Sequence, residues 1–142
     1  MAFYKKQQQK VNGKWYPRSV LVGDPITTDQ LALRLAAEST LSPIDVLAVL
    51  KGLSGIMGEY MAQGRSVMLN GIGSFSLNAS AVGNGVDTPE EVSANQINGV
   101  KVHFVPATTY RRDGCPPDKS RRAVRTLTDV DIEWIDIDSL VK

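Results

Sequence analysis

The sequence predicts an α+β fold, and three observations predict it. Two segments, beginning at Thr27 and Ser42, carry helix start signals followed by apolar residues at three- and four-residue steps. Residues 66–77 form two short alternating runs that meet at a Gly-x-Gly, which is typical of strands joined by a tight turn. A further alternating run returns at residues 100–105. The length of 142 residues is that of one domain with short extensions.

The first predicted element is a β-hairpin. Asn12-Gly13 is a strong hairpin signal, and it predicts antiparallel strands at residues 3–11 and 14–22. Pro17 lacks a backbone donor, which favours an edge position for the second strand. Gly23-Asp24-Pro25 ends this sheet.

Two helices are expected next. Thr27 and Gln30 have the spacing of a capping box at the start of the first helix. Ser42-Pro43 starts the second, because serine caps a helix and proline suits its first position. Gly64 is the natural stop of the second helix. The first helix carries a narrow apolar stripe of Leu31, Ala32, Leu35 and Ala36.

Three glycines, Gly52, Gly55 and Gly58, recur every third residue inside the second helix. Each costs about 1 kcal/mol relative to alanine in a helix interior. They form either a bare face that another helix or sheet can approach closely or a locally weak helix, and the pattern leaves both interpretations open.

The Gly71-x-Gly73 junction is predicted to be a turn or bulge between two strands. Residues 78–98, which we call the arm, are rich in Asn, Ser, Ala and Gly. A structureless loop of that length is uncommon in a compact domain, so the arm is either a protruding β-arm or disordered.

Beyond the returning strand, Pro106 to Arg112 predicts a short helix, which Cys115-Pro116-Pro117 ends. A basic linker follows. Residues 130–134 alternate cleanly and predict a last strand, with a bulge at Ile135 where the phase shifts.

Charge is segregated along the chain, although the net charge is only +1. The first twenty residues hold five cations and no carboxylate, and residues 111–125 hold a second basic cluster. Residues 129–138 are acidic, and residues 66–100 contain no Lys or Arg. The basic N-terminal strand, with Tyr4, Trp15 and Tyr16, is either a nucleic-acid surface or the partner of the acidic strand at 130–137. We favour the second interpretation.

Several classes of site are not expected. Gly71-x-Gly73 lacks the third glycine and the following helix of a dinucleotide site. The single Cys115 excludes a disulfide within the chain and a multi-cysteine metal site, and Cys115 with His103 is a weak basis for catalysis. No cofactor, metal or small-molecule substrate is predicted, and the protein is not expected to be an enzyme. No apolar run approaches the ~20 residues of a membrane span, and no secretory signal is evident, so a cytoplasmic location is expected.

The order of these elements resembles the bacterial HU and integration host factor family of histone-like DNA-binding proteins. The resemblance covers Ile26 to Arg112, and three stretches carry it: residues 40–45 between the helices, 67–75 at the hairpin, and Phe104-Val105-Pro106-Ala107. It implies an α+β HU/IHF-like fold with two N-terminal helices, a β-hairpin with an extended arm and a short C-terminal helix. The N-terminal hairpin and C-terminal strand are additions similar to an HU-like variant of Bacteroides-type bacteria.

The family resemblance also implies an intertwined homodimer that binds double-stranded DNA at the nucleoid. In that family, the arms of the dimer enter the minor groove and bend the duplex. This arm carries no cation and bears Asp87, Glu90 and Glu91, so bending by the arm is not expected.

We therefore expect weak, sequence-independent phosphate contacts from the body and the linker. The expected contact residues are Arg65, Lys101, Arg111, Arg112, Arg121, Arg122 and Arg125. The alternative is a structural or protein-interaction module with the same fold that has lost DNA bending. The expected organisation is an N-terminal β extension (residues 1–25), an HU-like domain (26–114), and a basic linker with an acidic strand (115–142).

Overall fold

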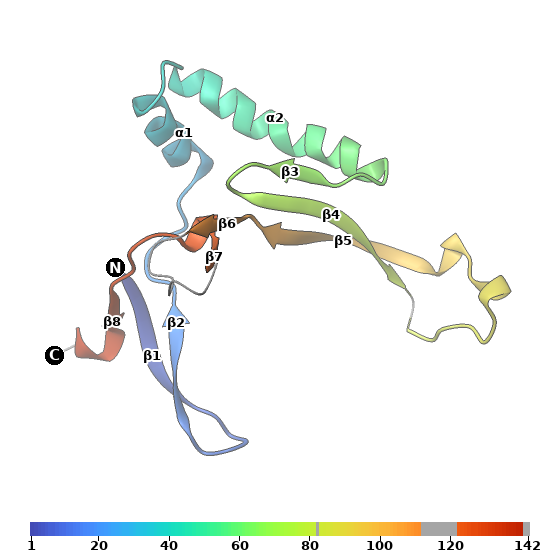
Figure 1. Ribbon diagram of the computed structural model, residues 1–142, viewed down its shortest axis with the longest axis horizontal. Helices are drawn as coiled ribbons and strands as arrows, with labels where there is room; N and C mark the ends of the chain where they lie inside the picture. The colour runs from blue at the N-terminus through green and yellow to red at the C-terminus, as the bar shows by residue number, and fades with distance from the viewer. Residues whose placement is uncertain (82, 112–121, 141–142) are drawn as a thin grey trace.

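The computed structural model describes residues 1–81, 83–111 and 122–140. Two helices and three small sheets make up a mixed α+β architecture (Figure 1). Helices α1 (Thr28–Ala37) and α2 (Pro43–Ala62) pack against each other, and α2 lies along strands β3 (Val67–Leu69) and β4 (Gly73–Ala81). The predicted mixture of helices and strands is therefore confirmed.

Both predicted helix starts are confirmed. Thr27 and Gln30 form the capping box of α1, with the Thr27 backbone donating to Gln30 Oε1 at 2.9 Å. Ser42 caps α2 by accepting from the backbone N–H of Asp45, and Pro43 is the first helical residue. Gly64, at φ 78°, follows the end of α2 in the left-handed conformation that glycine adopts most readily.

The central sheet has the order β3-β4-β5, with β5 at Ile97–Pro106. Gly73 opposes Pro106, and a Cβ at Gly73 would overlap the Val105 carbonyl oxygen and come within 2.6 Å of the Phe104 ring. The Phe75 and Phe104 rings pack with their centroids 4.8 Å apart. Glycine at this position therefore lets β4 approach β5 directly beside an aromatic pair.

The arm is a protruding β-hairpin. Strands β4 and β5 remain paired from Gly73↔Pro106 to Ala81↔Ile97, with an irregularity between Ser80 and Ala81. Two 3₁₀ turns, Pro89–Glu91 and Ala94–Gln96, lie between the strands at the far end (Figure 1). Of the two alternatives predicted for residues 78–98, a protruding β-arm or disorder, the structure has the β-arm.

The predicted helix after Pro106 is wrong. Residues Thr108–Arg111 form strand β6, which pairs antiparallel with β7 (Arg122–Arg125). Threonine and tyrosine favour extended backbone, and a partner strand later in the chain supplies the ladder that a short isolated helix would lack. The HU/IHF-like expectation of a short C-terminal helix is corrected accordingly.

The N-terminal hairpin and the C-terminal segment form one sheet, in the order β2-β1-β8. Strand β1 (Ala2–Gln8) pairs with β2 (Trp15–Val20) and, in parallel, with β8 (Trp134–Asp136). The last strand was expected at residues 130–134, but it begins only at Trp134. Trp134 opposes Ala2, at the very start of β1, so the residues before Trp134 have no β1 residues to pair with. The expected bulge at Ile135 is also wrong, since Ile135 pairs in register with Phe3. Two further 3₁₀ turns occupy Thr126–Thr128 and Ile137–Ser139.

The interior is small. Among the described residues, the buried hydrophobic side chains are Ala32, Val46 and Met61, and the leucines of the predicted α1 stripe remain about half exposed. The chain exposes 12176 Å². A compact monomer of its mass, 15.4 kDa, would expose about 7,200 Å². The excess reflects an extended shape (Figure 1), and many large apolar side chains of the described residues are exposed.

Candidate nucleic-acid interface

The seven cations expected to contact DNA fall into two groups and a remainder. Arg65 lies between α2 and β3, and Lys101 lies on β5 opposite Asn78. If the β3–β4 ladder is extended by two residues from Val67↔Phe75, Arg65 falls opposite Leu77, which itself opposes Val102. On that extended register, Arg65 and Lys101 would lie at neighbouring levels of the central sheet, although β3 itself begins at Val67.

Local packing orients Arg65. Its guanidinium lies over the Tyr60 ring, 5.7 Å from the centroid, and its backbone N–H donates to the Tyr60 carbonyl at 3.4 Å. Stacking on a ring leaves the guanidinium donors at its rim free for a phosphate. Lys101 is exposed and has no ion pair within the described part of the chain.

The second group lies on the β6–β7 ribbon. Arg125 opposes Thr108, and Arg111 opposes Arg122. The ribbon is tied to the hairpin turn, because Ala107 donates to the Ile72 carbonyl at 3.0 Å and Thr126 donates to the Ala107 carbonyl at 2.9 Å. Arg112 and Arg121 lie outside the described residues. The ribbon thus holds arginines at the end of the central sheet opposite the arm (Figure 1).

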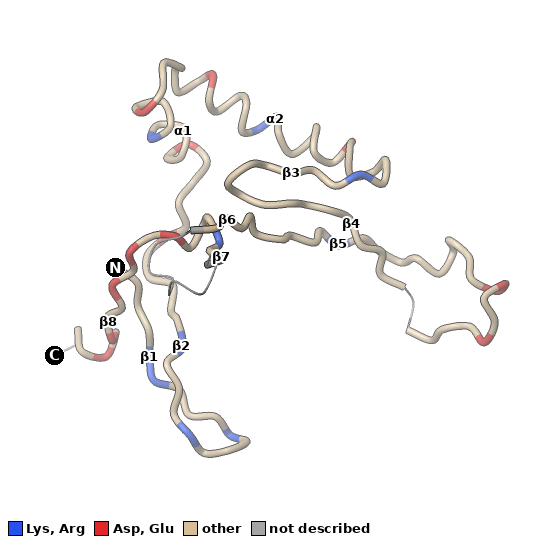
Figure 2. Tube along the Cα trace, in the orientation of Figure 1, with Lys and Arg blue, Asp and Glu red and all other residues tan. Residues whose placement is uncertain are grey.

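The arm has the opposite character. Its far end carries Asp87, Glu90 and Glu91, and Figure 2 shows acidic residues there. The returning strand of the arm bears its first cation at Lys101. A phosphate backbone would be repelled by the end of the arm, while the body offers positive charge.

The basic N-terminal strand pairs with the acidic C-terminal strand, which confirms the interpretation we favoured. Lys6 Nζ lies 2.8 Å from Asp136 Oδ2. Hydrogen bonding to Asp136 raises the pKa of Lys6, and the same bond lowers the pKa of Asp136. Neutralisation is limited, however, because Lys5, Lys10 and Lys14 form no ion pair with the described residues.

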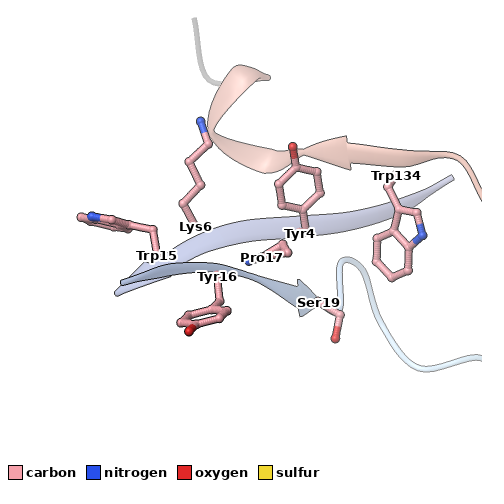
Figure 3. A pocket seen from close by; sticks show the side chains of 7 residues that line it. All are labelled: Tyr4, Lys6, Trp15, Tyr16, Pro17, Ser19 and Trp134. Atoms are coloured by element: carbon pink, nitrogen blue, oxygen red, sulfur yellow. The ribbon is translucent and has the colours of Figure 1, made fainter. Parts of the chain in front are cut away.

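The β2-β1-β8 sheet carries a groove, and the sequence predicted only some of the residues that line it. It has a volume of about 740 Å³, and Tyr4, Trp15, Tyr16 and Trp134 line it together with Lys6 and Pro17 (Figure 3). The sequence pointed to the first three aromatic residues but not to Trp134, which lies more than a hundred residues further along the chain. The alternation of the last segment was the available signal, and its register was misplaced.

Other kinds of site find no support in the described ranges. No group of three or more His, Cys, Asp or Glu side chains there could hold a metal ion. Cys115 lies outside these ranges, so a Cys115–His103 pair is not tested. No helix that the structure describes is long and apolar enough to cross a membrane.

Comparison with known proteins gives a family. The model of a family described as an HU domain fused to a wHTH, Ig or glycine-rich motif matches residues 2–114. Among solved structures, the fold is similar to that of a Bacteroides vulgatus protein provisionally described as a bacterial DNA-binding protein. That match has a TM-score of 0.47 and 13% identity, and it covers 72% of this chain and 41% of the other, so this chain spans less than half of it. No curated protein matches the chain.

Proposed function

Because the chain belongs to the family of HU domains fused to a wHTH, Ig or glycine-rich motif, we propose that it is a non-catalytic protein that binds double-stranded DNA. Binding is to backbone phosphates with little sequence preference. The observation that carries this proposal is the β6–β7 ribbon, where arginines stand at opposed positions of an antiparallel ladder. The register thus gathers arginine positions that a polyanionic backbone would attract.

The proposed contacts are divided between body and linker. Arg111, Arg122 and Arg125, with Arg112 and Arg121 of the linker, form the main phosphate-binding cluster. Arg65 and Lys101 are secondary contacts at the other end of the sheet. The arm takes no part in binding, so this protein holds DNA without the bending that a basic arm would give.

The protein acts as a homodimer in this proposal. The apolar surface of α2 is wider than the side packed on α1 and the central sheet: Val49, Ile56 and Tyr60 remain 63%, 56% and 47% exposed. A helix apolar on this much of its circumference is usually buried. Obligate homodimers bury about 2,000–5,000 Å² in total, and this exposed face of α2 is the surface that we expect to contribute to it.

The family match at residues 2–114 includes β1 and β2, and only β8 of their sheet lies beyond it. The β2-β1-β8 sheet joins residues 1–25 to the end of the 115–142 segment, and residues 26–114 form the DNA-binding body of our proposal. We assign this arrangement to the Bacteroides-type HU-like variant, and the location to the bacterial nucleoid in the cytoplasm.

Salt-dependent binding to a short duplex tests the proposal. The logarithm of the association constant should fall linearly with the logarithm of salt concentration, with a slope of about −0.9 per phosphate neutralised. Replacing Arg111, Arg112, Arg121 and Arg122 with alanine should abolish binding. Removal of residues 83–96 should leave the binding unchanged, as should the matched charge loss Lys10→Ala with Lys14→Ala.

A second function is favoured by the acidic arm: a structural or protein-interaction module on the same fold. No duplex binding at low salt, together with an unaltered dimer, would support this module and refute the DNA proposal. Dimerisation has its own test, because Ile56→Glu should give a monomer by solution mass. Lys51→Glu, an exposed change elsewhere on α2, should not.

A further inference from the structure

The groove on the β2-β1-β8 sheet is built from aromatic faces. Trp15 and Trp134 stand at opposite ends of it, with Tyr4 between them on one side and Pro17 at its centre (Figure 3). Trp15 and Trp134 remain 65% and 53% exposed. Apolar rings exposed on a small sheet cost free energy in water, so they point to a ligand that covers them.

The register gives the spacing of these rings. Trp134 opposes Ala2 of β1, Tyr4 comes two residues later, and Trp15 opposes Gln8, four residues further on. At about 3.3 Å per residue, the three rings span about 20 Å along the strands. They also cross the sheet from β8 through β1 to β2. A diagonal row of separated rings suits an extended chain of planar groups better than a single compact ligand.

The charge at the Trp15 end of the row favours an anionic chain. Residues 1–23 hold Lys5, Lys6, Lys10, Lys14 and Arg18 and no carboxylate. Lys10 and Lys14 lie in the hairpin loop next to Trp15, and Figure 2 shows cations at this end. The Trp134 end lies on the acidic C-terminal segment, where Lys6 pairs with Asp136 at 2.8 Å.

We propose that this groove binds single-stranded nucleic acid, with bases stacked on Trp134, Tyr4 and Trp15 and phosphates held near Lys10 and Lys14. Sheets that carry exposed aromatic residues stack two or three unpaired bases in this way. Duplex DNA does not fit the groove, because its bases are already stacked and offer only their edges. The site is independent of the phosphate-binding cluster on the β6–β7 ribbon.

Tryptophan fluorescence gives a direct measurement, because both tryptophans of the chain line the groove. Titrating the full chain with a short oligothymidylate should quench its emission in a saturable, salt-dependent manner. Trp15→Ala and Trp134→Ala should each weaken binding about 5- to 150-fold, the range for loss of one stacked base. Trp15→Phe should retain most of the affinity, and Trp15→Leu should not, because leucine keeps the apolar surface without the ring.

Controls separate this site from duplex binding and from unfolding. Tyr110→Ala removes an equally exposed ring on β6 and should leave oligothymidylate binding unchanged, as should the four-arginine variant that abolishes duplex binding. Circular dichroism should show intact folding in every variant. The inference is overturned if oligothymidylate fails to quench at low salt, if the Trp15 and Trp134 variants bind it like the parent, or if a duplex displaces it at equal phosphate concentration. Saturable binding of a proline-rich peptide without binding of the oligonucleotide would also overturn it.

Discussion

Gly73 is the position where a single methyl group should do the most damage. It is buried, its φ of 153° is a conformation that only glycine adopts readily, and it opposes Pro106 at the start of β4. In Gly73→Ala the new Cβ would overlap the Val105 carbonyl oxygen and lie 2.6 Å from a Phe104 ring carbon. The carbonyl belongs to the backbone of the partner strand, so the ladder itself must shift.

The expected cost has two parts. The backbone conformation alone costs about 1–3 kcal/mol for a non-glycine residue. Disturbing adjacent ladder hydrogen bonds adds about 0.5–1.5 kcal/mol each. Gly73→Ala should therefore lower the free energy of unfolding by about 3 kcal/mol or more, a large part of the stability of a domain with so small an interior.

Gly71 supplies the matched control. It also has a positive φ, 81°, but a Cβ there would meet nothing closer than the Thr126 methyl group at 4.0 Å. Gly71→Ala should cost only the left-handed backbone, about 1–2 kcal/mol. Urea unfolding followed by far-ultraviolet circular dichroism measures both variants. Equal destabilisation of the two would refute the close approach of β4 to Phe104 and Val105 as the reason for glycine at position 73.

Three further changes test charge, the arm and the α2 face. The pKa of Asp136 is lowered by its hydrogen bond with Lys6. Above pH 3.8, the ordinary carboxyl value, the ion pair therefore contributes its full stabilisation to the docking of β8. That stabilisation is lost as the pH falls through the lowered pKa of Asp136. In a Trp15→Phe background, Trp134 emission should report that acid transition, and Asp136→Asn should remove it; a transition unchanged by the substitution contradicts the assignment. Glu90→Lys with Glu91→Lys should leave duplex binding and its salt dependence unchanged, because the arm takes no part in binding; tighter binding with a salt slope steeper by about one unit per new phosphate contact would show that the arm does reach DNA. Gly52→Ala should stabilise α2 of the dilute monomer by about 1 kcal/mol, because alanine favours the helix more than glycine does. The added methyl group should weaken the dimer if a partner helix packs closely at Gly52. Equal stabilisation at low and high protein concentration would exclude such a close partner.

Local signals in the sequence predicted local structure well. The capping box at Thr27, the serine cap at Ser42 and the turn at Gly71 are fixed by contacts within four residues, so they could be read from the chain. The arm could be inferred because β4 and β5 are joined by one excursion. The two failures, the helix after Pro106 and the register of the last strand, both depend on partners distant in sequence. Residues 108–111 became a strand because Arg122–Arg125 supplies its ladder.

The candidate sites divide in the same way. Charge runs are visible in the sequence, and they led to Arg111, Arg122 and Arg125, but no pattern within the chain indicated that Arg111 and Arg122 would be opposed. The aromatic groove depended on a parallel pairing between the two ends of the chain, which places Trp134 near Tyr4. Parallel strands need long connections, and nothing near either strand specifies which partner it will take.

The separation of charge from the arm has a structural consequence. This arm extends as a β-hairpin with Leu77, Val100 and Val102 on one face of its ladder and polar Asn78 and Ser80 on the other. Positive charge stands instead on the β6–β7 ribbon and on the N-terminal hairpin (Figure 2). A duplex that lies across the ribbon would follow the body without being wrapped by the arm. The N-terminal hairpin, with its row of rings, would then meet only those strands whose bases are unpaired.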